Sequence, residues 1–137
     1  MNTLIQEIIS WINNSNKKLI IGISGHGAAG KTTFAHMLME ELKNGVNYLN
    51  TDPYIVSSSI RKHAVIEYTH KGTLHRFKMT ACHPAAHHVA SLERDVLMLK
   101  AGMNLLTIDT HYLKSKILSS QNKLTIVEGM SVAFAKP

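Results

Sequence analysis

Apolar residues recur along the first third of the chain at spacings that alternate between helix and strand. We expect an amphipathic helix over residues 3–13 because its apolar residues fall at three-to-four-residue spacing. Those residues are Leu4, Ile5, Ile8, Ile9 and Ile12. A short apolar run at 19–24 (LIIGIS) is typical of a buried parallel strand. Residues 31–43 then predict a helix and 46–50 a second strand. The order predicts a βαβ unit.

The remaining pattern predicts further elements of both kinds. They are a short helix at 56–63, a hairpin of strands 65–69 and 74–79, a helix over 85–100 behind Pro84, and strands at 105–108 and 124–127. We expect Trp11 to be a packing residue. Cys82 is expected to be a small buried residue, with a pocket residue as the alternative. The fold class predicted is a three-layer α/β domain over 1–137, with a mainly parallel sheet flanked by helices.

Composition narrows the class of protein. The chain has 137 residues, of which 45% are apolar and 18% are charged, as in ordinary globular domains. Because no run approaches the roughly 18 apolar residues of a membrane span, we expect no membrane contact. The chain starts without early basic residues and holds one cysteine, so we expect a reducing cytoplasm and no intrachain disulfide. The formal net charge is +6, but the lysines are scattered along the sequence, which argues against nucleic acid as a partner.

The strongest motif begins where the first predicted strand ends. Residues 25–32 read GHGAAGKT and fit G-x-x-x-x-G-K-[ST] at every fixed position, between a predicted strand and a predicted helix. Glycines let backbone N–H groups approach phosphate oxygens, and the helix start adds its positive dipole end. The predicted ATP-binding residues are Gly25, His26, Gly27, Ala28, Ala29, Gly30, Lys31, Thr32 and Thr33. Lys31 would reach the β- and γ-phosphates, and the Thr32 hydroxyl would bind Mg²⁺.

Two acidic residues follow predicted strands. Asp52 lies just past the second strand and Glu128 just past the last one. Since ligands gather at the carboxyl ends of parallel strands, both carboxylates are expected beside the phosphate loop. Asp52 is the candidate general base and a candidate metal ligand, and Glu128 is expected to hold a magnesium-bound water. Both residues also suit simple turns, before Pro53 and Gly129.

The same glycines leave a second interpretation open. Gly25, Gly27 and Gly30 also match the dinucleotide fingerprint G-x-G-x-x-G, and Asp52 lies near the position of its ribose-binding acid. That interpretation gives no role to Lys31 and Thr32, so we favour the phosphate loop. A non-catalytic ATP-binding module is a third hypothesis. The oligomeric state stays open, with a homo-oligomer among the alternatives.

Four segments together resemble the uridine kinase and phosphoribulokinase family of P-loop kinases. They are 21–33 (IGISGHGAAGKTT), 50–54 (NTDPY), 82–84 (CHP) and 126–129 (IVEG), in the family's order and spacing. The resemblance implies an ATP-dependent, magnesium-requiring kinase that phosphorylates a hydroxyl of a nucleoside- or sugar-like molecule. It implies that Asp52 and Lys31 are catalytic. It also implies acceptor contacts from Tyr54, His83, Asp109 and His111.

Departures from the family pattern bear on the substrate. Cys82 stands where uridine kinases carry an acid that contacts the sugar, so uridine does not carry over simply. Family members continue into further strands and an arginine-bearing lid. The arginines here, Arg61, Arg76 and Arg94, lie in no lid-like motif. We therefore expect a fold truncated at its C-terminus, whose lid region is absent and which transfers phosphate poorly alone.

Nine histidines allow further chemistry. His83 and His87 are four residues apart, a spacing that can hold zinc, with His88 adjacent. No further cysteine, aspartate or glutamate in the local sequence completes a ligand set. His83 or His87 could instead line the acceptor pocket, or all three could be structural.

Overall fold

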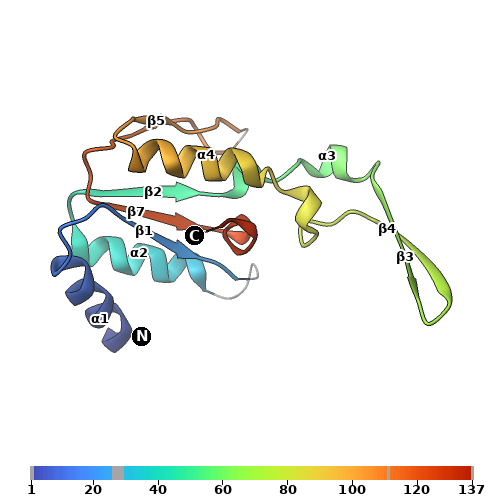
Figure 1. Cartoon of the computed structure of the whole chain (residues 1–137), viewed down its shortest axis with the longest axis horizontal. Coiled ribbons are helices and arrows are strands. Elements are labelled where there is room, and N and C mark those ends of the chain that lie inside the picture. Colours follow the sequence, from blue (N-terminus) through green and yellow to red (C-terminus); the bar gives the residue numbers. More distant parts are fainter. Residues whose placement is uncertain (1, 26–29, 111, 137) are drawn as a thin grey trace.

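A three-stranded parallel sheet forms the centre of the protein. The computed structural model describes residues 2–25, 30–110 and 112–136. The strands run in the order β1 (Leu19–Ile23), β7 (Leu124–Glu128) and β2 (Val46–Asn50). Ile23 and Asn50 both pair with Glu128, so the three strands end level with one another. The predicted α/β fold class is therefore confirmed, and the carboxyl ends of the strands share one edge (Figure 1).

Helices cover both faces of this sheet. α1 (Asn2–Asn13) and α2 (Lys31–Leu42) lie on one face, and α4 (Val89–Lys100) lies on the other (Figure 1). All five residues of β7 are buried because this strand is central. Alternation along β7 separates two apolar clusters. Leu124 and Ile126 pack with α1 and α2, whereas Val127 packs with α4.

Most predicted elements occur where the pattern placed them. The N-terminal helix, the two strands of the βαβ unit and the helix between them match within one or two residues. The packing prediction for Trp11 was wrong, since its side chain is 55% exposed. Leu4 is similarly exposed, and the buried stripe of α1 consists of Ile5 and Ile12. No helix in the described residues is long and apolar enough to cross a membrane.

The predicted helix behind Pro84 starts later than expected. Pro84–Ala86 forms a short 3-10 helix, η2, and the α-helix begins only at Val89. The intervening backbone is extended because it pairs with another segment. The amide of His88 donates to the carbonyl of Tyr54 at 2.7 Å, and Val56 donates to Ala86 at 2.7 Å. A tertiary contact thus overrides the local helical pattern.

The strand predicted at 105–108 does not join the central sheet. It is shortened to β5 (Leu105–Leu106), which pairs antiparallel with β6 (Ile117–Leu118). The amide of Thr107 donates to the carbonyl of Lys116 at 2.8 Å just beyond this pair. The chain therefore folds back on itself here, and Leu105 and Leu118 contribute to the apolar cluster under α4.

A projecting hairpin completes the fold. α3 (Ser58–Arg61) leads into β3 (Val65–His70), which pairs antiparallel with β4 (Thr73–Lys78). α3 and the hairpin of β3 and β4 both lie away from the main body (Figure 1). Lys71 and Gly72 form the turn with positive φ angles of 52° and 78°, the geometry that two-residue hairpin turns favour. The predicted hairpin is confirmed.

Gly129 permits the close approach of two strand ends. Its φ is +145°, and a Cβ at this position would overlap Oγ1 of Thr51. Thr51 is fully buried and its hydroxyl has no hydrogen-bond partner within the described structure. The chain that leaves β7 therefore needs glycine here for steric reasons as well as for its backbone conformation.

Gly129→Ala should destabilise the fold by about 2 to 3 kcal/mol, because overpacking adds to backbone strain. Gly102→Ala is the matched control, since Gly102 also has positive φ but a methyl group added there would meet nothing within 4 Å. It should cost only about 1 kcal/mol. Adding Thr51→Ala to Gly129→Ala should restore part of the stability in urea unfolding. Equal losses for the two glycine variants would contradict the steric explanation.

Candidate active site

The predicted phosphate loop joins the end of β1 to the start of α2. Gly25 follows β1, and Gly30 precedes α2 with φ +77° and ψ 14°, a left-handed conformation that suits glycine. Gly30 offers no side chain to cap the first turn of α2. Such a helix start presents backbone N–H groups and a positive dipole end to an anion. The strand–loop–helix context of the motif is confirmed. His26, Gly27, Ala28 and Ala29 lie outside the described residues.

Lys31 and Thr32 open α2, directly beyond the loop. Lys31 is partly buried, and Thr32 and Thr33 are exposed in the first turn. Their predicted contacts with phosphate and metal stay predictions. Their position at the helix start is the one that the predicted roles require.

Glu128 and Asp52 lie at the same edge of the sheet. Glu128 is the last residue of β7 and is only 2% exposed. Asp52 opens the short 3-10 helix η1 (Asp52–Tyr54), two residues beyond β2. Between them, the amide of Thr51 donates to the carbonyl of Glu128 at 2.9 Å. The predicted convergence of the loop and both acids on one edge follows from the level strand ends.

Tyr48 is a site residue that the sequence did not indicate. Its hydroxyl donates to Oε1 of Glu128 at 2.7 Å. Burial, followed by this hydrogen bond, raises the pKa of Tyr48, and the charges of Glu128 and Asp52 add to the rise. The phenol of Tyr48 therefore interacts electrostatically with both carboxylates. Only the pairing of β2 with β7 could have revealed the contact, because the two residues are 80 positions apart.

The donor set of this edge suits a hard cation. The carboxylates of Asp52 and Glu128 and the hydroxyl of Thr32 are oxygen ligands of the kind that Mg²⁺ prefers. No group of three or more histidine, cysteine or acidic side chains that could hold a metal occurs among the described residues. A metal held here would therefore keep waters or phosphate oxygens as further ligands, which is usual for Mg²⁺ in nucleotide sites.

The strand order decides between the two nucleotide-binding interpretations. In the dinucleotide fold, the first strand lies next to the second. Here β7 lies between β1 and β2 and pairs with both. The dinucleotide interpretation of the glycine pattern is therefore wrong for this topology.

Comparison with solved structures supports the parallel α/β fold. One structure, described as a possible uridine kinase from Bacillus stearothermophilus, superposes with a TM-score of 0.62 at 22% sequence identity. The match covers 92% of this chain and 69% of the other. The chain therefore shares the fold of that structure. No protein-family model and no curated protein sequence matches it.

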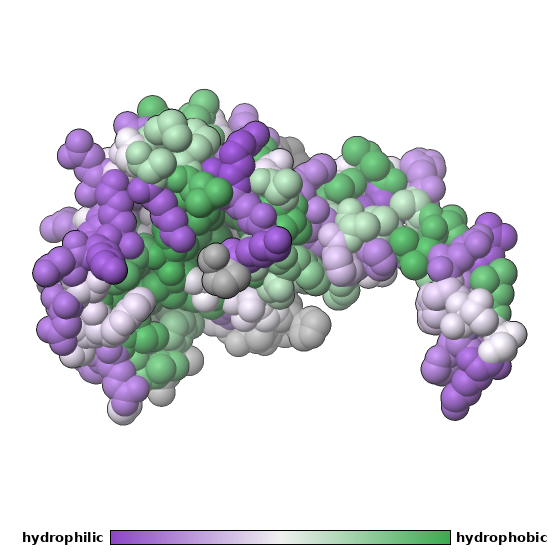
Figure 2. Space-filling model, viewed as in Figure 1, coloured by the Kyte–Doolittle hydropathy of each residue, from purple (hydrophilic) through white to green (hydrophobic). Residues whose placement is uncertain are grey.

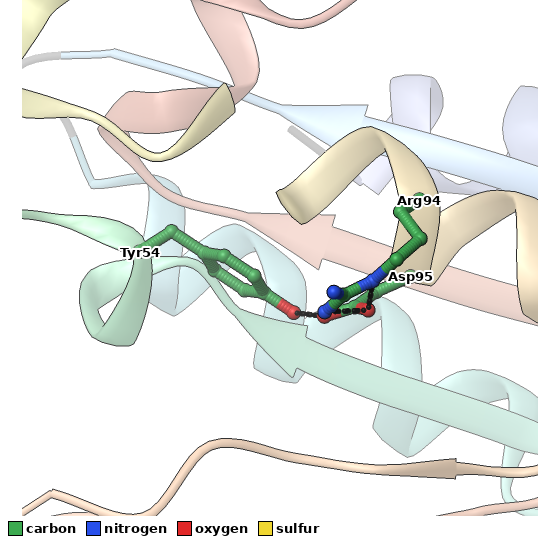
Figure 3. A network of polar contacts seen from close by, with 3 residues as sticks. All are labelled: Tyr54, Arg94 and Asp95. Atoms are coloured by element: carbon green, nitrogen blue, oxygen red, sulfur yellow. Dashed lines mark hydrogen bonds and ion pairs between the residues drawn. The ribbon is translucent and has the colours of Figure 1, made fainter. Parts of the chain in front are cut away.

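Tyr54, an expected acceptor contact, lies mainly in the core. Its side chain is 1% exposed, and its hydroxyl donates to Oδ2 of Asp95 on α4 (Figure 3). Arg94 binds the other oxygen of that carboxylate, with Nε at 3.0 Å and Nη2 at 2.9 Å. Burial, and then the bond to Asp95, raise the pKa of Tyr54. This network connects η1 to α4, and it thereby helps to position Asp52, the first residue of η1.

The other predicted acceptor residues occupy different surroundings. His83 caps η2, because its Nδ1 accepts from the amide of Ala85 at 3.1 Å. Asp109 is exposed and accepts from the amide of Ser115 at 3.2 Å. His111 lies outside the described residues. Burial and then the charge of Asp52 raise the pKa of Tyr112. Their acceptor roles stay predictions.

The histidine cluster does not form a zinc site. His87 is buried, with Nε2 at 2.7 Å from the carbonyl of Ala81 and Nδ1 at 2.6 Å from the hydroxyl of Ser131. Since a carbonyl can only accept, Nε2 carries the proton, and both ring nitrogens are engaged. The structural interpretation of His87 therefore holds, and the zinc interpretation of His83, His87 and His88 is wrong.

Cys82 differs from its predicted environment. It is exposed rather than buried. It lines a small cavity of about 160 Å³ together with Ser24 and Gly25, at the start of the phosphate loop. The packing prediction for Cys82 was thus wrong. The alternative interpretation, a pocket residue, fits this position better.

Tyr54→Phe should destabilise the fold by about 1 to 3 kcal/mol, because Asp95 would stay buried with one partner fewer. Folding also raises the pKa of this phenol, so the native state keeps its proton where the unfolded chain loses it. Stability should therefore fall as the pH rises above about 10, and less steeply in the variant. Urea unfolding at several pH values measures both effects. Tyr68→Phe, at an exposed tyrosine, should change neither.

Proposed function

We propose that this chain binds ATP through the loop from Gly25 to Thr33 and transfers its γ-phosphoryl group to a hydroxyl of a nucleoside- or sugar-like molecule. The level ends of β1, β7 and β2 carry the proposal. They bring the phosphate loop, Glu128 and Asp52 to one edge. The fold shared with the structure described as a possible uridine kinase supports the same assignment.

Each side chain would have a role that suits its chemistry. Lys31 would hold the β- and γ-phosphates from the start of α2. Thr32 and Glu128 would hold magnesium, Glu128 through a bound water, with Asp52 able to contribute. When bound, the metal would neutralise charge on the phosphate oxygens.

Asp52 would act as general base. It would accept the proton of the acceptor hydroxyl while that oxygen attacks the γ-phosphorus. The bond from the γ-phosphorus to the bridging oxygen breaks, and ADP leaves with the electron pair. The partial exposure of Asp52 leaves it accessible to an acceptor, whereas Glu128 is buried.

The acceptor would bind beyond the end of β2. A cavity of about 110 Å³ lies there, lined among others by Asn50, Pro53 and Ile108. Tyr54, His83, Asp109 and His111 stay the proposed acceptor contacts, and Tyr54 also lines this cavity. We do not propose uridine as the acceptor, because Cys82 stands where a sugar-binding carboxylate is expected.

Titration calorimetry and a phosphate-transfer assay test the proposal. Lys31→Ala should abolish magnesium-dependent ATP binding, and EDTA should weaken binding to the wild type. Asp52→Asn should retain ATP binding but lower the transfer rate by about 100-fold or more. Glu41→Gln, an exposed acid on α2, is the matched control and should behave as wild type.

Unchanged ATP affinity in Lys31→Ala would contradict the assignment of this loop as the ATP-binding site. Tight ATP binding without transfer to any nucleoside or sugar would instead favour the non-catalytic ATP-binding module.

Tyr48→Phe should raise the magnesium concentration needed for half-maximal ATP binding by about 10-fold, because Glu128 would lose the bond that orients it. ATP affinity at saturating magnesium should change little. Tyr68→Phe removes a hydroxyl from an exposed tyrosine and should leave the magnesium dependence unchanged. An unchanged magnesium requirement in Tyr48→Phe would contradict the proposed role of Glu128 in metal binding.

A further inference from the structure

The hairpin of β3 and β4 carries an aromatic face. Cross-strand pairing places Ile66, Tyr68 and His70 opposite Phe77, His75 and Thr73, so these side chains share one face of the ribbon. Tyr68 is 49% exposed and Phe77 is 55% exposed. The hairpin projects from the body, and apolar and polar residues lie side by side on the projecting arm (Figure 2).

Three rings on this face, those of Tyr68, His75 and Phe77, form a compact cluster. Tyr68 stacks on His75 with centroids 4.9 Å apart and an angle of 17° between the planes. Phe77 lies 6.0 Å from His75 and 6.1 Å from Tyr68, also stacked. Exposed apolar surface of this kind marks an interaction site, and a two-stranded ribbon gains little stability by itself. We therefore expect this aromatic cluster to contact another molecule.

Charge indicates the chemistry of that partner. Residues 61–78 hold five of the 15 lysines and arginines of the chain but only one of its nine acidic residues. That acid, Glu67, pairs with Arg76 at 2.9 Å. Lys62, Lys71 and Lys78 are exposed before the hairpin, at its turn and at its end. Basic residues are thus more frequent in the segment 61–78, which includes the hairpin, than in the chain as a whole.

We propose that this hairpin binds single-stranded nucleic acid. Exposed rings accept bases of any sequence on their faces. The exposed lysines at the turn and at the end of the hairpin attract the phosphates, Lys78 from the ribbon face opposite the rings, because it pairs with Val65. A second copy of the chain is a poorer occupant. A symmetric contact would bring two arms of the same positive charge together. The surface is separate from the proposed ATP site, and the inference does not rest on the proposed kinase function.

Fluorescence anisotropy with a fluorescein-labelled oligouridylate of about 12 nucleotides tests the aromatic part. The double variant Tyr68→Ala with Phe77→Ala should weaken binding by about 10-fold or more, because the bases lose the rings on which they stack. Tyr68→Leu with Phe77→Leu keeps apolar bulk but removes the rings, and should show a similar loss. Trp11→Ala is the control, since Trp11 is 55% exposed on α1.

A charge-reversal pair tests the electrostatic part. Lys71→Glu with Lys78→Glu should weaken binding and reduce its salt dependence. Lys17→Glu with Lys18→Glu makes the same change in net charge at two exposed lysines before β1, and should have a much smaller effect. An oligothymidylate of equal length compares DNA with RNA, and binding of either supports the proposal.

Several outcomes would overturn it. They are wild-type binding by the ring-deleted variants that retain the native circular dichroism spectrum, or equal losses in the two charge-reversal pairs. Displacement of the oligonucleotide by saturating magnesium–ATP would place it in the phosphate site instead. Sedimentation that shows a dimer lost on ring deletion, without oligonucleotide binding, would assign the face to self-association. Oligonucleotide binding that persists in Lys31→Ala would support the hairpin site whether or not the kinase proposal survives.

Discussion

Two backbone hydrogen bonds at the carboxyl edge of the sheet hold the candidate site together. Thr51 donates to the carbonyl of Glu128, and Gly129 donates to the carbonyl of Ile23 at 3.0 Å. They continue the parallel pairing of β7 with both neighbours beyond the strands themselves. The ends of three strands are thereby kept level, and each leads into a segment that carries chemistry. Without that alignment, the phosphate loop and the two acids would be unrelated turns.

Side-chain bonds then orient the carboxylates that the backbone brings together. Tyr48 reaches from β2 to Glu128, across the strand pair. Tyr54 reaches from η1 to Asp95 on α4 and so anchors the turn that carries Asp52. In both cases a tyrosine supplies apolar bulk to the interior and one donor to a buried acid. The acid at the edge, Glu128, is buried, and burial strengthens its electrostatic interactions.

The projecting hairpin depends on different physics from the body. The body is stabilised by two apolar clusters on either face of a buried strand. The hairpin has no such layer, and its rings pack mainly on one another. Its aromatic face and excess of positive charge are features of a surface that meets another molecule rather than of a core.

The sequence by itself determined the local elements and the phosphate motif. The helical stripe of α1, the β-branched run of β1 and the Lys71-Gly72 turn follow from short-range periodicity and backbone preference, so the pattern predicted them. Only the tertiary structure decided that β7 lies between β1 and β2, that Tyr48 binds Glu128, and that Cys82 is exposed beside Gly25. It also delayed α4 to Val89. These features depend on contacts between residues far apart in the chain, which local spacing does not encode.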